Sequence, residues 1–282
     1  MRPDLVLVRE LIEESPVISA RLGAGVPTAW IRAAESVVGT LPPSYRWWLT
    51  EYGSGTSAGA RIATVPSPGT RSGEDDDITG GWRLDGGRLC FCVEPDGGDT
   101  YHFALDRQAG GEYAVVRRDR VSGQEELVAD TFAGFLTVQV ALRNGFGAGL
   151  TSALARLWRS TPGVLLPNGV LIYGPHTIIE RNETYQVGEY APDWVLIGDD
   201  SGGSGLFMRR HPCDRTTVYL LDLGAGERDI DSCGVSEKLT DNLLDWLRAT
   251  GSERAARPQK APENPERPVR PRSCPRPVCS GG

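Results

Sequence analysis

A short segment rich in glycine and aspartate separates two strand-like runs twice in this chain, and this repetition narrows the possible folds more than any other feature. The first copy reads EPDGGDTY (residues 94–101) and the second reads GDDSGGSGLF (residues 198–207). Glycine and aspartate in such positions are typical of tight turns between strands. Each half of the chain is therefore expected to contain a hairpin built around this turn.

Helices are predicted on either side of the strands of the first half. An amphipathic helix is predicted over residues 28–38, and a second follows Leu41-Pro42, with Ser44 available as its cap and Gly53 as its end. The strand-like runs RLCFCVE, TYHFALD and EYAVVRRD come next. Asp130 is then expected to cap a closing helix with the sequence TFAGFLTVQVAL.

The same order recurs in the second half, which indicates an internal repeat. A helical stripe precedes Leu166-Pro167, much as a helix precedes Leu41-Pro42, and the runs GVLIYG, TIIERN, TYQVGEY, DWVLIGDD, GLFMRR and TTVYLLDLG are strand-like. Ser236 is expected to cap a final helix that ends before Gly251. Aromatic and apolar residues at helical or strand spacing in both halves are predicted to lie in the core. They are Tyr45, Trp48, Phe103, Phe132, Phe135, Trp158, Trp194, Leu243 and Trp246.

The second turn admits three interpretations. Its Asp200-Ser201-Gly202-Gly203 is similar to the Gly-Asp-Ser-Gly-Gly around the nucleophile of trypsin-like proteases, but none of the three histidines has a matching context. A calcium loop would need oxygen ligands at alternate positions and a final glutamate, and glycine and apolar residues follow here instead. Because the first copy of the turn has no serine, a hairpin turn is favoured, with no catalytic residue, no metal and no cofactor.

Charge is distributed unevenly along the 282 residues. Residues 251–282 hold seven of the 30 basic and three of the 37 acidic side chains, which leaves 23 basic and 34 acidic, a net charge of −11, for the first 250 residues. Such a body disfavours direct nucleic-acid binding and favours a basic partner. The tail is rich in proline and arginine and poor in apolar residues, so it is expected to be disordered.

Neither a membrane segment nor a signal peptide is expected. No apolar run approaches the roughly 20 residues of a membrane span, and charges interrupt the apolar residues of the N-terminus MRPDLVLVRELIEESP. The six cysteines include no Cys-x-x-C pair, so a disulfide framework or zinc site is not indicated. The composition therefore predicts a cytoplasmic protein.

Taken together, these segments resemble the SUKH superfamily. IRAAESVVGTLPPSYRWWLTEYGSG is similar to its opening helices, and VEPDGGDTYHFALD with VADTFAGFL is similar to its central strands and closing helix; LPNGVLIYG, ERNETYQVGEYAPDWVLIGDDSGGSGLFM and VYLLDLG look like a second, divergent copy. The resemblance implies an α+β fold with a curved mixed sheet and helices packed on one side. It also implies two tandem domains, over residues 1–142 and 150–250, followed by the tail 251–282.

What the resemblance implies about function is non-catalytic binding, as in bacterial immunity proteins that neutralise polymorphic toxins. The expected partner is a basic toxin domain, for which a nuclease is one candidate, and acidic loop residues beside an aromatic one would bind it. These candidate contacts are Glu74, Asp75, Asp76, Asp77, Trp82, Asp96, Asp99, Asp199 and Asp200. Two alternatives stay open: a cytoplasmic scaffold or regulator that holds an endogenous partner, and an enzyme that uses Ser201 or the turn aspartates.

Overall fold

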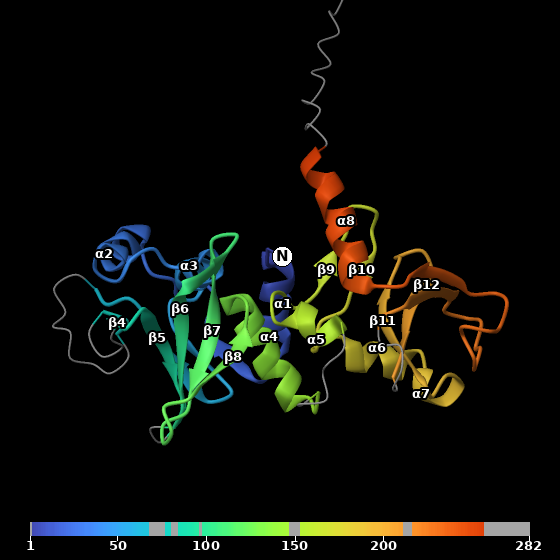
Figure 1. Cartoon of the computed structure of the whole chain (residues 1–282), viewed down its shortest axis with the longest axis horizontal. Coiled ribbons are helices and arrows are strands. Elements are labelled where there is room, and N and C mark those ends of the chain that lie inside the picture. Colours follow the sequence, from blue (N-terminus) through green and yellow to red (C-terminus); the bar gives the residue numbers. More distant parts are fainter. Residues whose placement is uncertain are drawn as a thin grey trace, which may run out of the picture.

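The computed structural model is an α+β protein, and its described part contains two antiparallel β-sheets (Figure 1). The structure describes residues 2–67, 77–79, 84–95, 98–146, 153–210 and 216–256, with side chains as far as residue 250. One hydrophobic core gathers buried residues between Val8 and Val140, and a second gathers those between Ala141 and Leu247. Figure 1 shows the first sheet on the left and the second on the right, with helices between them.

The first half places its strands in nearly the order of the sequence. Its eight-stranded sheet runs β1-β2-β3-β5-β6-β7-β8, and β4 pairs with β5. All pairings between these named strands are antiparallel, so the expected mixed sheet is wrong. The reason is that consecutive strands are neighbours and the chain reverses between them, whereas parallel strands need a crossover. The elements are α1 (Leu5–Glu14), β1 (Ile18–Ala20), α2 (Thr28–Val38), α3 (Pro43–Glu51), β2 (Gly55–Ser57), β3 (Ala60–Ile62), β4 (Leu84–Asp85), β5 (Arg88–Val93), β6 (Thr100–Ala109), β7 (Glu112–Arg118), β8 (Glu125–Ala129) and α4 (Phe132–Arg143).

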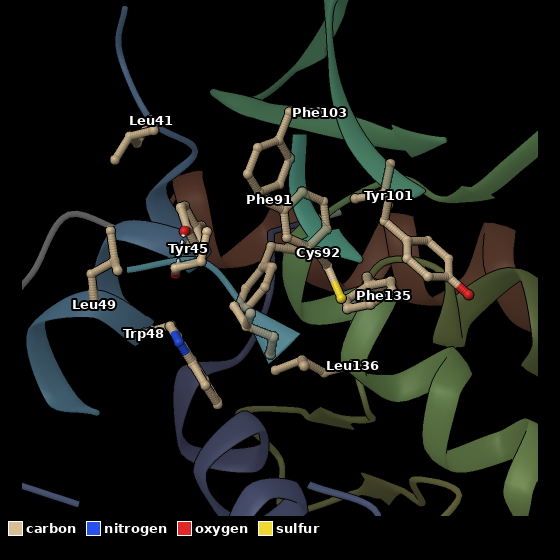
Figure 2. Packing of buried hydrophobic residues seen from close by; sticks show 14 of the residues in the cluster. Leu41, Tyr45, Trp48, Leu49, Phe91, Cys92, Tyr101, Phe103, Phe135 and Leu136 are labelled. Carbon is tan, nitrogen blue, oxygen red and sulfur yellow. Dashed lines mark hydrogen bonds between the residues drawn. The ribbon is translucent and has the colours of Figure 1, made fainter. Parts of the chain in front are cut away.

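Aromatic rings fill the first core, as Figure 2 shows. Phe91 stacks on Phe103 with ring centroids 4.1 Å apart, and Tyr45 meets Phe132 edge to face at 5.0 Å. Such contacts add to the free energy gained from burying the rings. The predicted core residues of both halves are buried, except that Trp246 is only partly buried against the second core.

The helix caps of the first half differ from those predicted. Pro42 is the N-cap of α3, and Ser44 lies inside the helix, where its amide and hydroxyl both donate to the buried Glu112 at 2.8 and 2.7 Å. Thr131, not Asp130, caps α4, because its Oγ1 accepts from the amide of Gly134 at 2.8 Å. Threonine and aspartate are both favoured as N-caps, so N-cap preference alone cannot decide between two adjacent residues of these types.

The second half forms a six-stranded sheet in the order β14-β13-β12-β11-β10-β9. Two predicted strands are helices instead, since TIIERN and TYQVGEY lie largely in α6 and α7. Asn182 explains α6: its side chain donates to the carbonyl of Leu196 and accepts from the amide of Leu196, which fastens the helix to β11. The elements are α5 (Ala153–Trp158), β9 (Val164–Leu165), β10 (Leu171–Ile172), α6 (Ile178–Thr184), α7 (Val187–Tyr190), β11 (Trp194–Asp199), β12 (Ser204–Arg209), β13 (Val218–Asp222), β14 (Glu237–Thr240) and α8 (Leu243–Ala256).

The last helix also begins later than predicted. Asn242 accepts from the amides of Leu244 and Asp245 and so caps α8, while the hydroxyl of Ser236 donates to the carbonyl of Ile230. The helix continues through Gly251 to Ala256, so it enters the segment predicted to be a disordered tail. The rest of that segment, residues 257–282, lies outside the described residues.

The two sheets share irregularities at matching places. The register of β5 and β6 shifts at Phe91, and that of β11 and β12 shifts at Ile197, each two residues before the end of its strand. The carbonyl of Phe91 accepts from Ala63, and the carbonyl of Ile197 accepts from Tyr173. Ala63 directly follows β3, which pairs with β5, and Tyr173 directly follows β10, which pairs with β11.

A helix contacts each of these two positions. Tyr45 of α3 donates its hydroxyl to the carbonyl of Ala63 at 2.7 Å, and Trp158 of α5 donates Nε1 to the carbonyl of Tyr173 at 3.1 Å. In both halves the donor thus comes from a helix, α3 in the first and α5 in the second. Leu166-Pro167 does follow a helix, α5, but it lies between β9 and β10, whereas Leu41-Pro42 lies between α2 and α3.

Backbone contacts join the two halves at the start of α4. The carbonyl of Arg159 accepts from the amide of Asp130 at 2.8 Å, and the carbonyl of Ser160 accepts from Thr131 Oγ1 at 2.7 Å. Gly134 allows this approach, since a Cβ there would lie 1.7 Å from the Arg159 oxygen.

Within the described segments, no helix has the length and apolar character needed to cross a bilayer.

Candidate functional site

The second glycine-rich turn joins β11 to β12 and holds its carboxylates with backbone donors. Asp199 Oδ1 accepts from the amide of Ser201 at 2.8 Å, and its Oδ2 accepts from the hydroxyl of Tyr173. Asp200 Oδ1 accepts from the amides of Gly202 and Ser204 at 2.8 and 2.9 Å. These backbone hydrogen bonds lower the pKa of Asp200, so the turn presents a fixed negative charge.

The turn, as predicted, is a hairpin connection. Ser201 has a left-handed backbone with φ of 57°, and its Oγ donates to the carbonyl of Gly169 at 2.9 Å. A nucleophilic serine instead needs a base within hydrogen-bond reach. His102 belongs to the other sheet, where its Nε2 lies 2.8 Å from Thr100 Oγ1. His176 Nδ1 is buried and has no hydrogen-bond partner among the described residues, and His211 lies outside them. The contacts of Ser201 are thus those of a turn residue.

Two of the first-half candidates are described, and neither is a free carboxylate. Asp77 is buried, at 5% exposure, and accepts from the amide and hydroxyl of Thr79. Asp99 accepts from the amide of Arg120 at 3.0 Å and lies 3.4 Å from Arg117 Nε. Asp77 therefore anchors the end of the predicted long loop rather than offering charge to a partner. The other candidates lie outside the described residues: Glu74, Asp75, Asp76, Trp82 and Asp96.

The described candidates do not form one cluster. Asp99 belongs to the first sheet, where its contacts are Arg117 and Arg120, while Asp199 and Asp200 belong to the second sheet and contact Tyr173 and their own turn. The sequence therefore finds two acidic turns correctly. It does not find a single site.

A charged surface that the sequence analysis missed covers the first sheet on the face opposite its aromatic core. Arg88 bridges Asp106 at 2.6 Å and Glu125 at 3.0 Å, and Arg118 bridges Glu125 at 3.0 Å and Asp85 at 3.1 Å. We call these five residues the charged ladder. The side chains of Asp85 and Asp106 are 72% and 61% exposed, whereas that of Arg88 is only 14% exposed. Two carboxylates of the ladder are therefore turned toward solvent and Arg88 lies beneath them, while Arg118 and Glu125 are about equally exposed, at 29% and 27%.

Electrostatics of the charged ladder keep it in one charge state near neutral pH. Burial raises the pKa of Glu125, but hydrogen bonds from Arg88 and Arg118 outweigh burial and leave it lowered. The hydrogen bond from Arg88 also lowers the pKa of Asp106. His102 lies beneath these groups, where burial and then the charge of Arg118 lower its pKa to about 4, so the imidazole is neutral.

Register explains why the sequence did not reveal the charged ladder. Arg118 lies opposite both Thr100 and Glu125, and Arg88 lies opposite both Ala104 and Asp85, so five strands bring the ladder to one face. The sequence does contain one indication of this surface. Side chains alternate between the two faces of a strand, and Phe103 is predicted to lie in the core. Thr100, His102 and Ala104 therefore have to lie on the opposite face. Register was not predicted, so the charges could not be paired.

Chemically, these surfaces are suited to binding a protein. Exposed carboxylates held by arginines and backbone amides can attract a basic partner without reorganising first. Among the described residues, no group of three or more histidine, cysteine, aspartate or glutamate side chains could hold a metal ion.

Comparison with known proteins finds a family model that is similar to a segment of the first half. Residues 25–138 match the model of the SMI1 / KNR4 family (SUKH-1). The match includes α2 through most of α4, and with them the charged ladder and the first acidic turn. A search of curated proteins found no match. The match supports the resemblance of residues 25–138 to the SUKH superfamily.

Proposed function

We propose that this chain is a non-catalytic immunity protein that neutralises a polymorphic toxin by binding it directly. The observation that carries the proposal is the SUKH match over residues 25–138, because that superfamily is associated with immunity proteins. The acidic body favours a basic toxin, and a nuclease is the leading candidate because enzymes that act on nucleic acids need basic surfaces. The proposed setting is the cytoplasm.

The binding surface that we propose combines the acidic turns with the charged ladder. Asp106 and Asp85 offer the most exposed carboxylates of the ladder, and Asp200 offers a carboxylate held in place by its turn. Acidic residues of the long first-half loop and turn complete the surface on sequence grounds: Glu74, Asp75, Asp76 and Asp96, with Trp82 as an aromatic anchor. Such charges accelerate encounter with a basic partner more than they strengthen the final complex.

The proposal includes a domain organisation with a divergent second SUKH-like copy over residues 150–250. Support comes from the shared strand order, from the matching bulges at Phe91 and Ile197, and from the matching donors Tyr45 and Trp158. Bulges usually persist within a fold family, so two at matching places are a better guide than local sequence. The first domain then covers residues 1–142, and the tail covers residues 251–282, of which the first six continue α8.

Co-expression with a toxin encoded beside this gene is the direct test. Growth should be restored when the chain is in excess, and the purified pair should form a stoichiometric complex. If the toxin stays fully active with the chain in excess, immunity against that toxin is excluded.

Charge removal tests the surface separately. Asp106→Asn and Asp200→Asn keep an oxygen acceptor and lose the charge, so they should slow association, and the loss should shrink as salt shortens the Debye length to about 8 to 10 Å. Glu189→Gln, on the exposed surface of α7, is the matched control and should bind as the unmodified chain does. If neither these substitutions nor salt changes the association rate, the interface lies elsewhere.

A scaffold or regulator that holds an endogenous partner is the alternative. The two separate sheets favour it, because each offers its own face to a different protein. This function predicts an endogenous partner and no toxin gene nearby, so gene neighbourhood distinguishes the two.

A further inference from the structure

A cleft of about 1280 Å³ lies where the N-terminus, the segment after α5 and helix α8 approach one another. Residues 2–5 form one wall, residues 163–167 another, and Leu244, Leu247 and Arg248 of α8 a third. The cleft includes neither the acidic turns nor the charged ladder, so it is separate from the surface proposed above.

The charge of this cleft is opposite to that of the body. Four arginines line it, with only Asp4 and Asp130 as carboxylates, so the net charge of its lining is +2 against −11 for the first 250 residues. Both carboxylates already have contacts. Asp4 caps α1 through the amide of Val6 at 3.1 Å, and Asp130 accepts from Ser160 Oγ at 3.2 Å and lies 3.4 Å from Arg159. Arg248 also pairs with Asp245, which does not line the cleft, at 2.6 Å. An anionic ligand would therefore meet mainly Arg2 and Arg156.

One wall of the cleft is the free edge of the second sheet. Strand β9 is the last in the order and pairs only with β10 among the described strands. Leu166 donates its amide to Val170, and in an antiparallel pair the next residue back turns its backbone groups the other way. The amide and carbonyl of Leu165 therefore point to the free edge. A Pro at position 167, which has no amide, is typical of such an edge.

Apolar surface accompanies this edge. Leu165 is 49% exposed and Leu5, on the opposite wall, is 38% exposed, while Leu157, Leu244 and Leu247 are buried beneath. An extended chain places alternate side chains on opposite sides. A segment with alternating acidic and apolar residues would therefore match both the arginines and the leucines.

We propose that this cleft binds an extended acidic segment of a protein partner, which adds as a strand to β9. Its backbone would pair with Leu165, its apolar side chains would contact Leu165 and Leu5, and its carboxylates would contact Arg156 and Arg2. The strand addition supplies affinity through main-chain hydrogen bonds, and the side chains supply specificity. The tail of this same chain is a poor occupant, because residues 251–282 carry seven basic against three acidic side chains.

The test uses the full chain and a fluorescein-labelled hexapeptide of alternating glutamate and leucine, followed by anisotropy at low and at physiological salt. The matched peptide carries lysine in place of glutamate. We expect the glutamate peptide to bind and the lysine peptide not to bind. Arg156→Glu should weaken binding by at least about tenfold, which is the effect of one reversed charge contact worth about 1.4 kcal/mol.

Two controls keep the result specific. Arg143→Glu reverses an exposed arginine of α4 that does not line the cleft, and it should change binding less than about twofold. Hydrogen exchange reports the strand addition itself, because the amide of Leu165 should become protected when the peptide is bound.

Four outcomes would overturn the proposal. Preference for the lysine peptide would contradict the charge argument, and equal binding by Arg156→Glu would place the peptide elsewhere. An unprotected Leu165 amide in the bound state would exclude strand addition. A dimer of the chain that Arg156→Glu dissociates would mean that a second copy occupies the cleft.

Discussion

The buried carboxylate of Glu112 accepts both the amide and the hydroxyl of Ser44, across 68 residues of sequence. Ser44 Oγ in turn lies 3.4 Å from the amide of Ala133, in the first turn of α4. One side chain from the start of β7 thus satisfies backbone groups at the start of α3 and, through Ser44, supports the start of α4. Anions are stabilised at helix N-termini, so this carboxylate holds the two core helices against the sheet.

Glu112→Ala should therefore destabilise the first half strongly. The substitution leaves the buried amide and hydroxyl of Ser44 without an acceptor, which costs about 2 to 4 kcal/mol. Glu112→Gln keeps an oxygen acceptor for the amide and should cost less. Chemical denaturation followed by tryptophan fluorescence measures both, and equal losses for the two variants would contradict the hydrogen-bond explanation.

The pH dependence of Glu112 has a definite sign. Burial raises the pKa of its carboxyl above the ordinary value of 4.5, and hydrogen bonds from Ser44 offset this only in part. The folded protein then binds this proton more tightly than the unfolded chain, so the contribution of Glu112 to stability falls as pH rises from about 4.5 through the raised pKa. Glu112→Gln lacks this loss. The free energy of unfolding of Glu112→Gln relative to the unmodified chain should therefore increase with pH over that window, and a decrease would contradict the sign.

Tyr45 and Trp158 offer a paired test of the correspondence between the halves. Tyr45→Phe removes the donor to Ala63 and should cost about 1 kcal/mol. Trp158→Phe removes the donor to Tyr173 and also leaves a cavity, so it should cost about 2 to 3 kcal/mol. Tyr113→Phe is the control, because the Tyr113 hydroxyl has no hydrogen bond among the described residues. If Tyr113→Phe lowers the free energy of unfolding as much as Tyr45→Phe does, the hydrogen bond to Ala63 does not contribute measurably to stability.

Ser201→Ala should have little effect on stability or on any activity. Its hydroxyl makes one exposed hydrogen bond, to the carbonyl of Gly169, and such a bond contributes at most about 1 kcal/mol. A fluorophosphonate probe tests the point directly, since it labels activated serines. Labelling of the unmodified chain that disappears in Ser201→Ala would make this a nucleophile after all.

Strand and helix positions with a regular apolar pattern were predictable from the sequence. The helix over residues 28–38 was confirmed with the same bounds, because Ile31, Ala34 and Val38 all face the core. The last helix was misplaced because Leu239 continues the helical spacing of Leu243 by coincidence. Leu239 in fact belongs to β14, and Asn242 starts the helix.

Features that depend on contacts across the fold were not predictable from a single sequence. The charged ladder needs the register of five strands, and α6 needs the contact of Asn182 with the β11 backbone. In the sequence, Asp77 belongs to an acidic run typical of an exposed loop. In the fold, its backbone bridges to Thr64 and its side chain is buried. Local pattern identifies which residues are polar, but only tertiary packing decides which of them remain exposed.

The contact between the two halves requires glycine at position 134. Its Cα faces the carbonyl of Arg159, and a methyl group would lie 1.7 Å from the oxygen and 2.2 Å from the carbon, both backbone atoms that cannot rotate away. Gly134→Ala must therefore push residues 159–160 off the start of α4 and strain the hydrogen bonds to Asp130 and Thr131. We expect a loss of at least about 2 kcal/mol, typical of overpacking in a tight contact.

The control for this substitution is Gly188→Ala on α7, where a methyl group would meet nothing within 4 Å. Alanine is the better helix former, so this variant should be neutral or more stable by up to about 1 kcal/mol. Calorimetry distinguishes the effects, because weakened docking should let the two cores unfold in separate transitions in Gly134→Ala. A single transition at the original temperature would mean that the halves do not depend on this contact, and the close approach of Arg159 to α4 would then contribute nothing to their association.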